Sequence, residues 1–230
     1  MTHADPAADP ITLPQTEAAI LDVHPPHESV HSWRDFFIHI ATIVIGLLIA
    51  IGLEQTVESL HHRHLLQQAR ENLHEEIQEN QQLLAMDRKY LESNRQTMLQ
   101  NIAILRQIKA NPKQAHIPLQ FPWQWSSPSA AAWNTARDTG ALALMPYEQV
   151  QGYSLLYGQQ GRVNEQANIY IQNQNHVAVP LVGTNDASTL SPMQIDDLIR
   201  GCATSDTDIS LLENFMNSLD RNYTSALNNH

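Results

Sequence analysis

An apolar run of eighteen residues, from Phe36 to Leu53, constrains this chain more than any other feature. The run contains no Asp, Glu, Lys or Arg, although the rest of the sequence is rich in charged and amide side chains. At a rise of about 1.5 Å per residue, a helix of this length nearly crosses a hydrocarbon layer about 30 Å thick. Trp33 precedes the run, where an aromatic residue suits a membrane interface. The sequence therefore predicts a single transmembrane anchor over residues 31–56.

Two other structures contain such runs, and the sequence disfavours both. A cleaved signal peptide needs a basic segment before its apolar core and a small-residue cleavage site after it. Here Arg34 is the only Lys or Arg before the run, and no A-x-A site follows. A buried helix of a soluble domain normally carries a polar face, which this run lacks.

Within the run, Gly46 and Ala50 form a small-xxx-small pair. Such pairs let two membrane helices approach closely, so this pair is a candidate helix–helix contact between two copies of the chain. The pattern is common in membrane helices, and self-association remains open.

The charges beside the run leave its orientation open. Arg34 lies before the run and Arg63 and Arg70 after it, a bias of one against two that slightly favours a cytoplasmic C-terminal side. An uncleaved N-terminal anchor followed by a large domain more commonly has a short cytoplasmic N-terminus. We therefore expect a bacterial inner-membrane protein with its C-terminal domain in the periplasm.

Composition excludes several classes of partner and site. The net charge of −11, without a basic patch, argues against nucleic-acid binding. The single cysteine, Cys202, rules out an intramolecular disulfide and a cysteine-rich metal site. Residues 1–30 are acidic, contain five prolines and lack an apolar period, which predicts a disordered tail.

A long helix is predicted after the anchor, because no proline occurs from residue 31 to about residue 109 and good helix formers dominate. We expect residues 57–110 to form a stalk. Apolar residues recur along it every seven positions, at Ile77, Leu84, Leu91, Met98 and Leu105.

The second row that a coiled coil needs is poor. It would consist either of Leu73, Asn80, Asp87, Asn94 and Asn101 or of His74, Gln81, Arg88, Arg95 and Ile102. This pattern favours a helix that packs on later helices of its own chain over a free-standing coiled coil.

Residues 111–230 are predicted to form a helical domain on the distal part of the stalk. Prolines interrupt the helix between residues 111 and 127, and Phe121, Trp123 and Trp125 are expected to be buried there. Ser127-Pro128 should open a helix that stops at Gly140. Pro146 should open another helix, which Gly152, Gly158 and Gly161 are expected to make weak or broken in the middle.

The last part of the chain continues the helical pattern. Residues 174–190 are expected to form a loop, and Ser191-Pro192 should open a helix that ends at Gly201. A terminal amphipathic helix is predicted by a spacing of three and four in Ile209, Leu212, Phe215, Met216, Leu219 and Tyr223. No segment alternates as a strand does, and the predicted fold class is all-α.

Two stretches resemble a known group of proteins. They are HPPHESVHSWRDFFIHIATIVIGLLIAIGLEQTVE with the helix after it, and AWNTARDTGALALMPYEQVQGYSLLYGQQ. They resemble uncharacterised bacterial single-pass membrane proteins with a long charged helix and a later W-x-x-x-x-x-T-G-x-L motif, here Trp133–Leu142. The resemblance covers roughly residues 24–105 and 132–160. It implies a bacterial envelope protein, and no catalytic residue can be transferred from the group.

No group of residues forms a convincing catalytic or metal site. His61 and His64 share a helix face, but no carboxylate or thiolate at a matching spacing completes a metal site. Glu71 and His74 form one E-x-x-H, whereas a di-iron bundle needs two. Motifs for nucleophilic catalysis or phosphate binding are absent from the sequence. We therefore predict no catalytic residue, no metal and no cofactor.

Two functions remain open, and a membrane enzyme, which a metal bound to the purified protein would indicate, is a weaker third. The first is a non-enzymatic membrane-anchored helical protein that binds an unknown protein partner or itself. The second is a sensor-like module that binds a small ligand between its helices and signals through a separate partner. Aromatic side chains could line the pocket of such a module, namely Trp123, Trp125, Trp133, Tyr153 and Tyr157.

Overall fold

A computed structural model describes residues 33–114, 117–184 and 186–228 of the chain. The predicted disordered tail, residues 1–30, lies outside these residues. The chain divides into two compact units, Met1–Gln55 and Thr56–His230. Each unit is considered by itself below.

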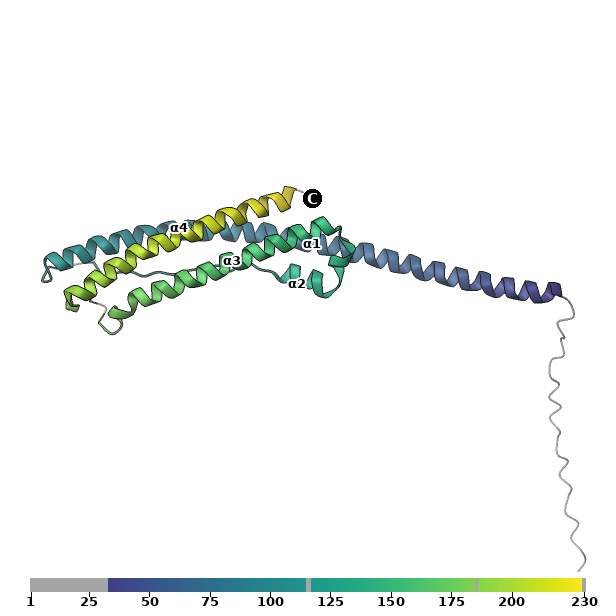
Figure 1. Cartoon of the computed structure of the whole chain (residues 1–230), viewed down its shortest axis with the longest axis horizontal. Helices are drawn as coiled ribbons and strands as arrows, with labels where there is room; N and C mark the ends of the chain where they lie inside the picture. The colour runs from purple at the N-terminus through teal and green to yellow at the C-terminus, as the bar shows by residue number, and fades with distance from the viewer. Residues whose placement is uncertain (1–32, 115–116, 185, 229–230) are drawn as a thin grey trace, which may run out of the picture. The chain divides into compact units, whose positions relative to one another are not determined.

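The longest element is α1, Trp33–Ala110, a continuous helix of 78 residues (Figure 1). Its sequence contains no proline and few residues of low helix propensity. The part of α1 within the first unit is exposed at every described residue. It includes an 18-residue window with a mean hydropathy of 2.6, of which 0% is buried. By length and composition, α1 is the one helix in the described part of the chain that could cross a membrane.

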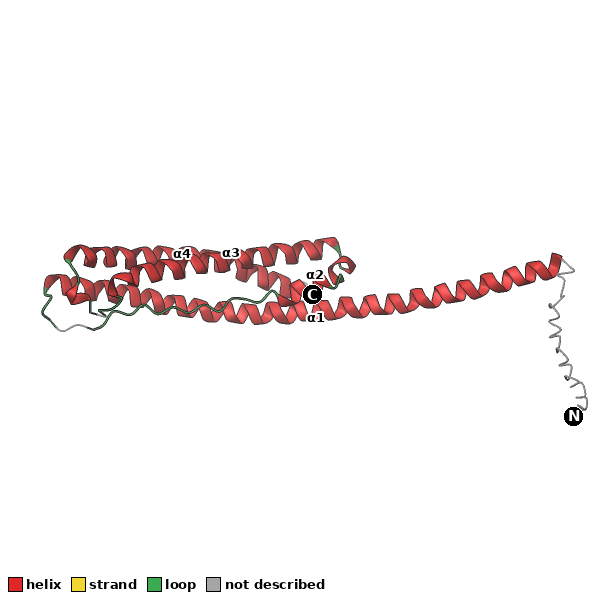
Figure 2. Cartoon of the chain, turned by 90° about the horizontal axis from the view of Figure 1, so that it is seen from below, coloured by secondary structure: helices red, strands yellow, loops and turns green. Residues whose placement is uncertain are grey.

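The second unit contains the rest of α1 and three further α-helices: α2 is Ala131–Asp138, α3 is Tyr147–Ala178 and α4 is Pro192–Asn228. Short 3₁₀ helices lie between them, namely η1 Ala141–Leu144, η2 Val179–Leu181 and η3 Ala187–Thr189. Figure 2 shows helices and loops only, and none of the described residues is in a strand. The prediction of an all-α fold is confirmed.

Hydrogen bonds between the long helices establish their relative directions. Glu76 pairs with Tyr157 and Asn94 with Tyr170, so α1 and α3 run parallel. Gln160 pairs with Tyr223. Asn173 and Asp208 also pair, so α3 and α4 run antiparallel. The segment 117–130, called the strap below, has no regular secondary structure and returns along α1. The strap runs antiparallel to α1, and it takes the place that the second helix of an up-and-down four-helix bundle would have (Figure 2).

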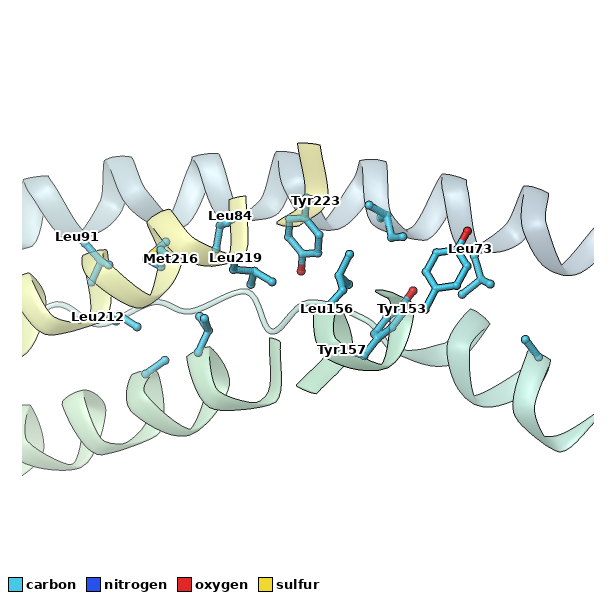
Figure 3. Packing of buried hydrophobic residues seen from close by; sticks show 14 of the residues in the cluster. Leu73, Leu84, Leu91, Tyr153, Leu156, Tyr157, Leu212, Met216, Leu219 and Tyr223 are labelled. Atoms are coloured by element: carbon cyan, nitrogen blue, oxygen red, sulfur yellow. The ribbon is translucent and has the colours of Figure 1, made fainter. Parts of the chain in front are cut away.

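The apolar core lies where α1, α3 and α4 face one another (Figure 3). The seven-residue row of α1 forms its first side, because Ile77, Leu84, Leu91, Met98 and Leu105 are all buried. The terminal amphipathic pattern forms another side, with Ile209, Leu212, Met216, Leu219 and Tyr223 all buried. Its remaining member, Phe215, is half-buried against the same cluster. Both apolar patterns therefore face the core.

The predicted start of α2 is wrong by a few residues. The helix begins at Ala131, with Ala130 as its N-cap, and not at Ser127-Pro128. The reason is a tertiary contact: the Glu76 carboxylate of α1 accepts hydrogen bonds from the Ala132 N–H at 2.9 Å and the Ser129 hydroxyl at 2.7 Å. A carboxylate from another helix therefore supplies the cap. The predicted stop is confirmed, since Gly140 adopts a left-handed φ of 79°.

The glycines of α3 do not break it, contrary to the prediction. The helix is continuous for 32 residues and includes Gly152, Gly158 and Gly161. Each glycine costs a helix about 1 kcal/mol relative to alanine. Burial of neighbouring apolar side chains, such as Leu156 and Val163, offsets this cost.

Two boundaries of the last part of the chain also differ from the prediction. Helix α3 extends to Ala178, so the predicted loop at 174–190 begins later and contains η2 and η3. The predicted end at Gly201 is wrong, because α4 continues through it. Gly201 is a contact residue: a Cβ there would lie 2.6 Å from Val177 Cγ2. The predicted opening is confirmed, since Ser191 and Gln194 form a reciprocal capping box.

Candidate functional site

The apolar part of α1 presents the first candidate surface. Phe36 and Leu53, the ends of the predicted span, are 44% and 66% exposed. A Cβ added at Gly46 would meet nothing within 4 Å, and Ala50 is exposed as well. Within the first unit, therefore, no described residue covers the small-residue pair.

A row of buried polar side chains in α1 holds the strap. The row consists of Asn80, Asp87, Asn94 and Asn101, each at most 2% exposed. Asn101 donates to the Gln120 carbonyl at 2.7 Å and accepts from the Gln120 N–H at 3.2 Å. Asn80 does the same with Ser129, at 2.8 Å and 2.7 Å. The polar row therefore binds main-chain donors and acceptors of the strap, which has no regular secondary structure to pair them.

The spacing of the polar row matches that of an extended chain. Seven residues of helix rise about 10.5 Å, and three residues of extended chain cover about 10 Å. Asp87 accordingly accepts from the Ser126 N–H at 3.1 and 3.2 Å, three residues before the Ser129 site. Asn94 donates to the Pro122 carbonyl at 3.1 Å. Because proline has no N–H, Asn94 Oδ1 receives no hydrogen bond from the strap, and it has no partner among the described residues.

Desolvation distinguishes Asp87 from its three amide neighbours. Burial raises the pKa of Asp87 from 3.8 to about 6, and the hydrogen bonds from Ser126 only partly oppose this rise. The other members of the polar row are neutral. Asp87 is therefore the member whose charge changes in a mildly acidic range.

Further hydrogen bonds extend the polar row into the core. Gln160 accepts from Asn80 at 3.3 Å and from the Tyr223 hydroxyl at 2.7 Å. It also donates to the Ser129 carbonyl at 2.8 Å, so this side chain joins α1, the strap, α3 and α4. The Tyr157 hydroxyl donates to Glu76 at 2.7 Å, and burial raises the tyrosine's pKa.

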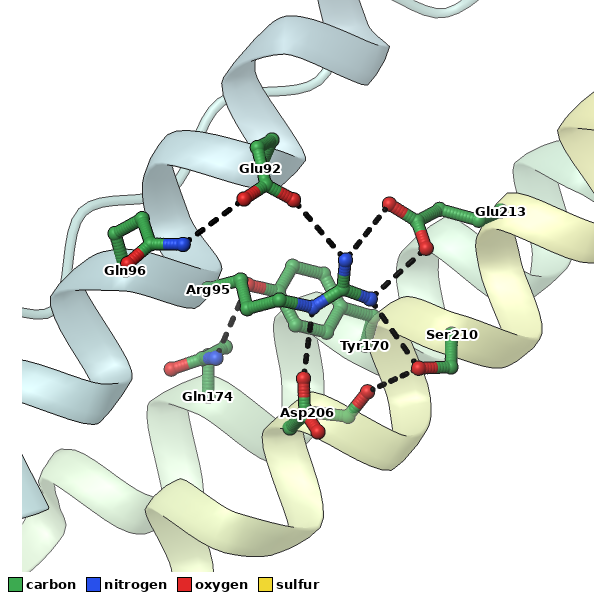
Figure 4. Close-up of polar contacts among 8 residues, drawn as sticks. All are labelled: Glu92, Arg95, Gln96, Tyr170, Gln174, Asp206, Ser210 and Glu213. Atoms are coloured by element: carbon green, nitrogen blue, oxygen red, sulfur yellow. Dashed lines mark hydrogen bonds and ion pairs between the residues drawn. The ribbon is translucent and has the colours of Figure 1, made fainter.

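Arg95 connects α1 with α4 at the edge of the bundle (Figure 4). Its guanidinium donates to Asp206 at 2.7 Å and to Glu213 at 2.8 Å. It also forms an ion pair with Glu92, one turn earlier in α1. The hydrogen bonds to Glu213 hold the pKa of Arg95 above its ordinary value. This network fully pairs the guanidinium, so its role is structural.

The predicted aromatic group is only partly assembled. Trp133 stacks on Tyr157 with ring centroids 5.3 Å apart and lies 6.4 Å from Tyr153. Trp125 is half-buried against the same core and donates to Asn164 at 3.1 Å. Trp123 is 60% exposed, so its predicted burial is wrong. These residues fill space in and around the core rather than line a single cavity.

A pocket of about 470 Å³ does open between α3 and the end of α4. Of the predicted aromatic group, it includes only Tyr153. Its lining consists of Glu148, Gln149, Gly152, Tyr153, Leu155, Leu156 and Arg162 from α3 and Asn222, Ser225 and Ala226 from α4. Since Tyr223 lies level with Gln160 and the helices are antiparallel, the described part of α4 ends about level with Leu155. The first turns of α3 extend past it, which leaves this side open.

Histidines and cysteine offer little chemistry. His61, His62 and His64 are exposed. In the described ranges, no three His, Cys, Asp or Glu side chains are placed so that they could hold a metal ion together. Cys202 is buried, and burial raises its pKa to about 11, so the thiol stays protonated at neutral pH.

The sequence predicts neither the binding of the strap by the polar row nor the pocket. Asn80, Asp87, Asn94 and Asn101 are regularly spaced, but within the seven-residue repeat they indicate only a poor coiled-coil row. A polar residue every seven positions beside a proline-rich segment of matching length is the signal that could have identified the strap. The pocket depends on where α3 and α4 end relative to each other, which no local pattern encodes.

Comparisons with protein-family models, with curated proteins and with solved structures gave no match for this chain. Its function has to be argued from its own residues.

Proposed function

We propose that this chain is a non-enzymatic, single-pass membrane protein of the bacterial envelope, whose helical domain binds a protein partner or a second copy of itself. One observation carries the proposal: the most apolar helix segment is wholly exposed, while the second unit has a packed core of its own. Leaving a leucine or isoleucine in water instead of burying it costs about 1.5–3 kcal/mol. Hydrocarbon is therefore the solvent that suits residues 36–53.

Two further features support the proposal. The sequence resemblance over residues 24–105 and 132–160 is to bacterial single-pass membrane proteins. Gly46 and Ala50 would allow a second copy of the anchor to approach closely. A domain in the periplasm remains our expectation for the orientation.

Topology is the first test, and the structure suggests how to design it. Native Cys202 is buried with a raised pKa, so it is replaced by alanine. One reporter cysteine is placed at Asn228, an exposed residue at the end of α4, and another, in a separate variant, at Ala7 in the N-terminal tail. Intact cells are treated with a thiol reagent that crosses the outer but not the inner membrane.

We expect the Asn228→Cys reporter to be labelled in intact cells and the Ala7→Cys reporter only after lysis. The reverse pattern would establish a span with a cytoplasmic domain and contradict the periplasmic location. Equal labelling of both reporters would contradict a single span. The Cys202→Ala parent is the control for background labelling.

A second candidate function is a small-ligand module, favoured by the pocket between α3 and α4. Its volume lies within the range of about 300–1,000 Å³ typical of ligand sites. The two candidates differ in their requirements, because a partner-binding domain needs no soluble ligand. If the domain binds a protein partner, variants that fill the pocket should leave partner binding intact. If it is a small-ligand module, the same variants should abolish its response to the ligand.

A further inference from the structure

We propose that the pocket between α3 and α4 binds a single-chain amphiphile with an anionic head group, with the head at Arg162. This inference refines the second candidate function and depends on neither the orientation nor the membrane span. It rests on three properties of the pocket: an unpaired cation, an apolar middle and a carboxylate at the far end of the lining.

Arg162 supplies the cation. Its guanidinium donates from Nε and Nη2 to the Gln159 amide oxygen in its own helix. None of the described carboxylates forms an ion pair with it, and its Nη1 group has no hydrogen-bond partner among the described residues. Arg95, by contrast, binds three carboxylates. A guanidinium that lines a pocket with donors to spare suits a carboxylate, phosphate or sulfate group.

The middle of the pocket is apolar. It is lined by Gly152, Tyr153, Leu155, Leu156 and Ala226. Leu155 is 65% exposed although it lines a concave surface, and Gly152 leaves room for a ligand, since a Cβ there would meet nothing within 4 Å. An apolar chain along these residues would remove this surface from water.

The charged residues of the lining lie at its two ends along α3. The lining extends from Glu148 to Arg162, roughly 21 Å along a helix axis. Glu148 at the far end would repel a second anionic group, so a ligand with one head fits better than a dicarboxylate.

Photo-crosslinking tests the proposal on the full chain. The protein is reconstituted in nanodiscs of neutral lipid with palmitate that carries a diazirine in its chain. An alkyltrimethylammonium probe with the same diazirine serves as the charge control. After illumination, crosslinked peptides are mapped by mass spectrometry. We expect palmitate to label the peptide spanning residues 149–162 at least fivefold more than the cationic probe does.

Pocket variants provide the second arm. Arg162→Ala removes the cation from an exposed position, and Gly152→Trp fills the apolar middle. Both should reduce labelling of residues 149–162 at least fivefold. Arg221→Ala removes the same charge from an exposed residue of α4 outside the lining and should retain labelling. Circular dichroism should show that all three variants keep the helical content of the parent.

The outcomes separate this inference from the membrane proposal. Labelling that persists in Arg162→Ala, or equal labelling by both probes, would overturn the anionic-head assignment. Absence of labels in residues 149–162 would overturn the site. Labels in residues 36–53 report insertion independently, so either proposal can fail alone. Competition by dodecanoate or by a lysophosphatidic acid would support the site and distinguish a free fatty acid from a lysolipid.

Discussion

The Asp87 carboxylate is the group in the polar row whose charge depends on pH. It is 2% exposed and both its oxygens accept one bifurcated hydrogen bond from the Ser126 N–H, yet no cation balances its charge among the described residues. Its neighbours in the row bind the strap with neutral amides. A carboxylate in this position therefore makes attachment of the strap dependent on pH, which an amide would not.

We expect Asp87→Asn to flatten the pH dependence of stability between about pH 4 and pH 7. The pKa of Asp87 rises from 3.8 to about 6 on folding, so within this window the folded chain holds a proton that the unfolded chain has released. The contribution of Asp87 is therefore fully present below pH 4 and is lost as the pH rises through 6. A rise of this size corresponds to up to about 3 kcal/mol.

Urea unfolding of both proteins at pH 5 and pH 7.5 measures the effect. The parent should lose more unfolding free energy than Asp87→Asn does between the two values. Parallel changes in the two proteins would contradict a buried, desolvated carboxylate at this position.

Replacing Asn101 by leucine discriminates between the two interpretations of the polar row. A coiled-coil seam would gain stability from the leucine. The structure predicts instead a loss of about 1–3 kcal/mol, because the Gln120 N–H and carbonyl lose both their partners. Hydrogen exchange of residues 117–126 should accelerate.

Asn72→Leu, the same exchange at an exposed residue of α1, is the matched control. It should leave exchange in the strap unchanged. If Asn101→Leu were as stable as the parent and the strap equally protected, the main-chain contacts would contribute nothing.

At the level of elements, one glycine weakens its helix and another allows two helices to pack closely. Gly158 is exposed, and a Cβ there would meet nothing within 4 Å, so it only weakens its helix. Gly201 allows α4 to approach Val177 of α3, with a hypothetical Cβ only 2.6 Å from Val177 Cγ2. Local propensity treats these residues alike, but packing distinguishes them.

We expect Gly158→Ala to raise the unfolding free energy by about 0.5–1 kcal/mol, through propensity alone. Gly201→Ala should lower it by about 1–3 kcal/mol, because the added methyl overpacks the contact. Chemical denaturation measures both. Adding Val177→Ala should relieve the clash, so a double-mutant cycle should show coupling between residues 177 and 201. Additive effects would argue against a close contact.

At the level of the whole molecule, the two units differ in what stabilises them. All the buried apolar residues in the described ranges lie between Ala69 and Tyr223, within the second unit. The first unit contributes an exposed apolar helix and none of this core. The folding of the second unit should therefore not require the first.

A fragment spanning Thr56–His230 tests this expectation. We expect it to be monomeric or a defined oligomer without detergent and to unfold cooperatively, while the full chain needs detergent or lipid. Gel filtration and thermal unfolding followed by circular dichroism are the measurements. Aggregation of the fragment, or non-cooperative unfolding, would show that the division at Gln55 does not separate independent folding units.

The sequence by itself determined the all-helical class, the apolar helix segment at 36–53 and the core faces of α1 and α4. These depend on hydropathy, propensity and spacing within one segment, which are local properties. It did not determine where α2 begins, whether α4 passes through Gly201, or what the polar row binds. Those depend on groups distant in sequence, such as Asn80 with Ser129 and Glu76 with Ala132. Only tertiary structure decides them, because a buried polar group takes the partner that packing brings within reach.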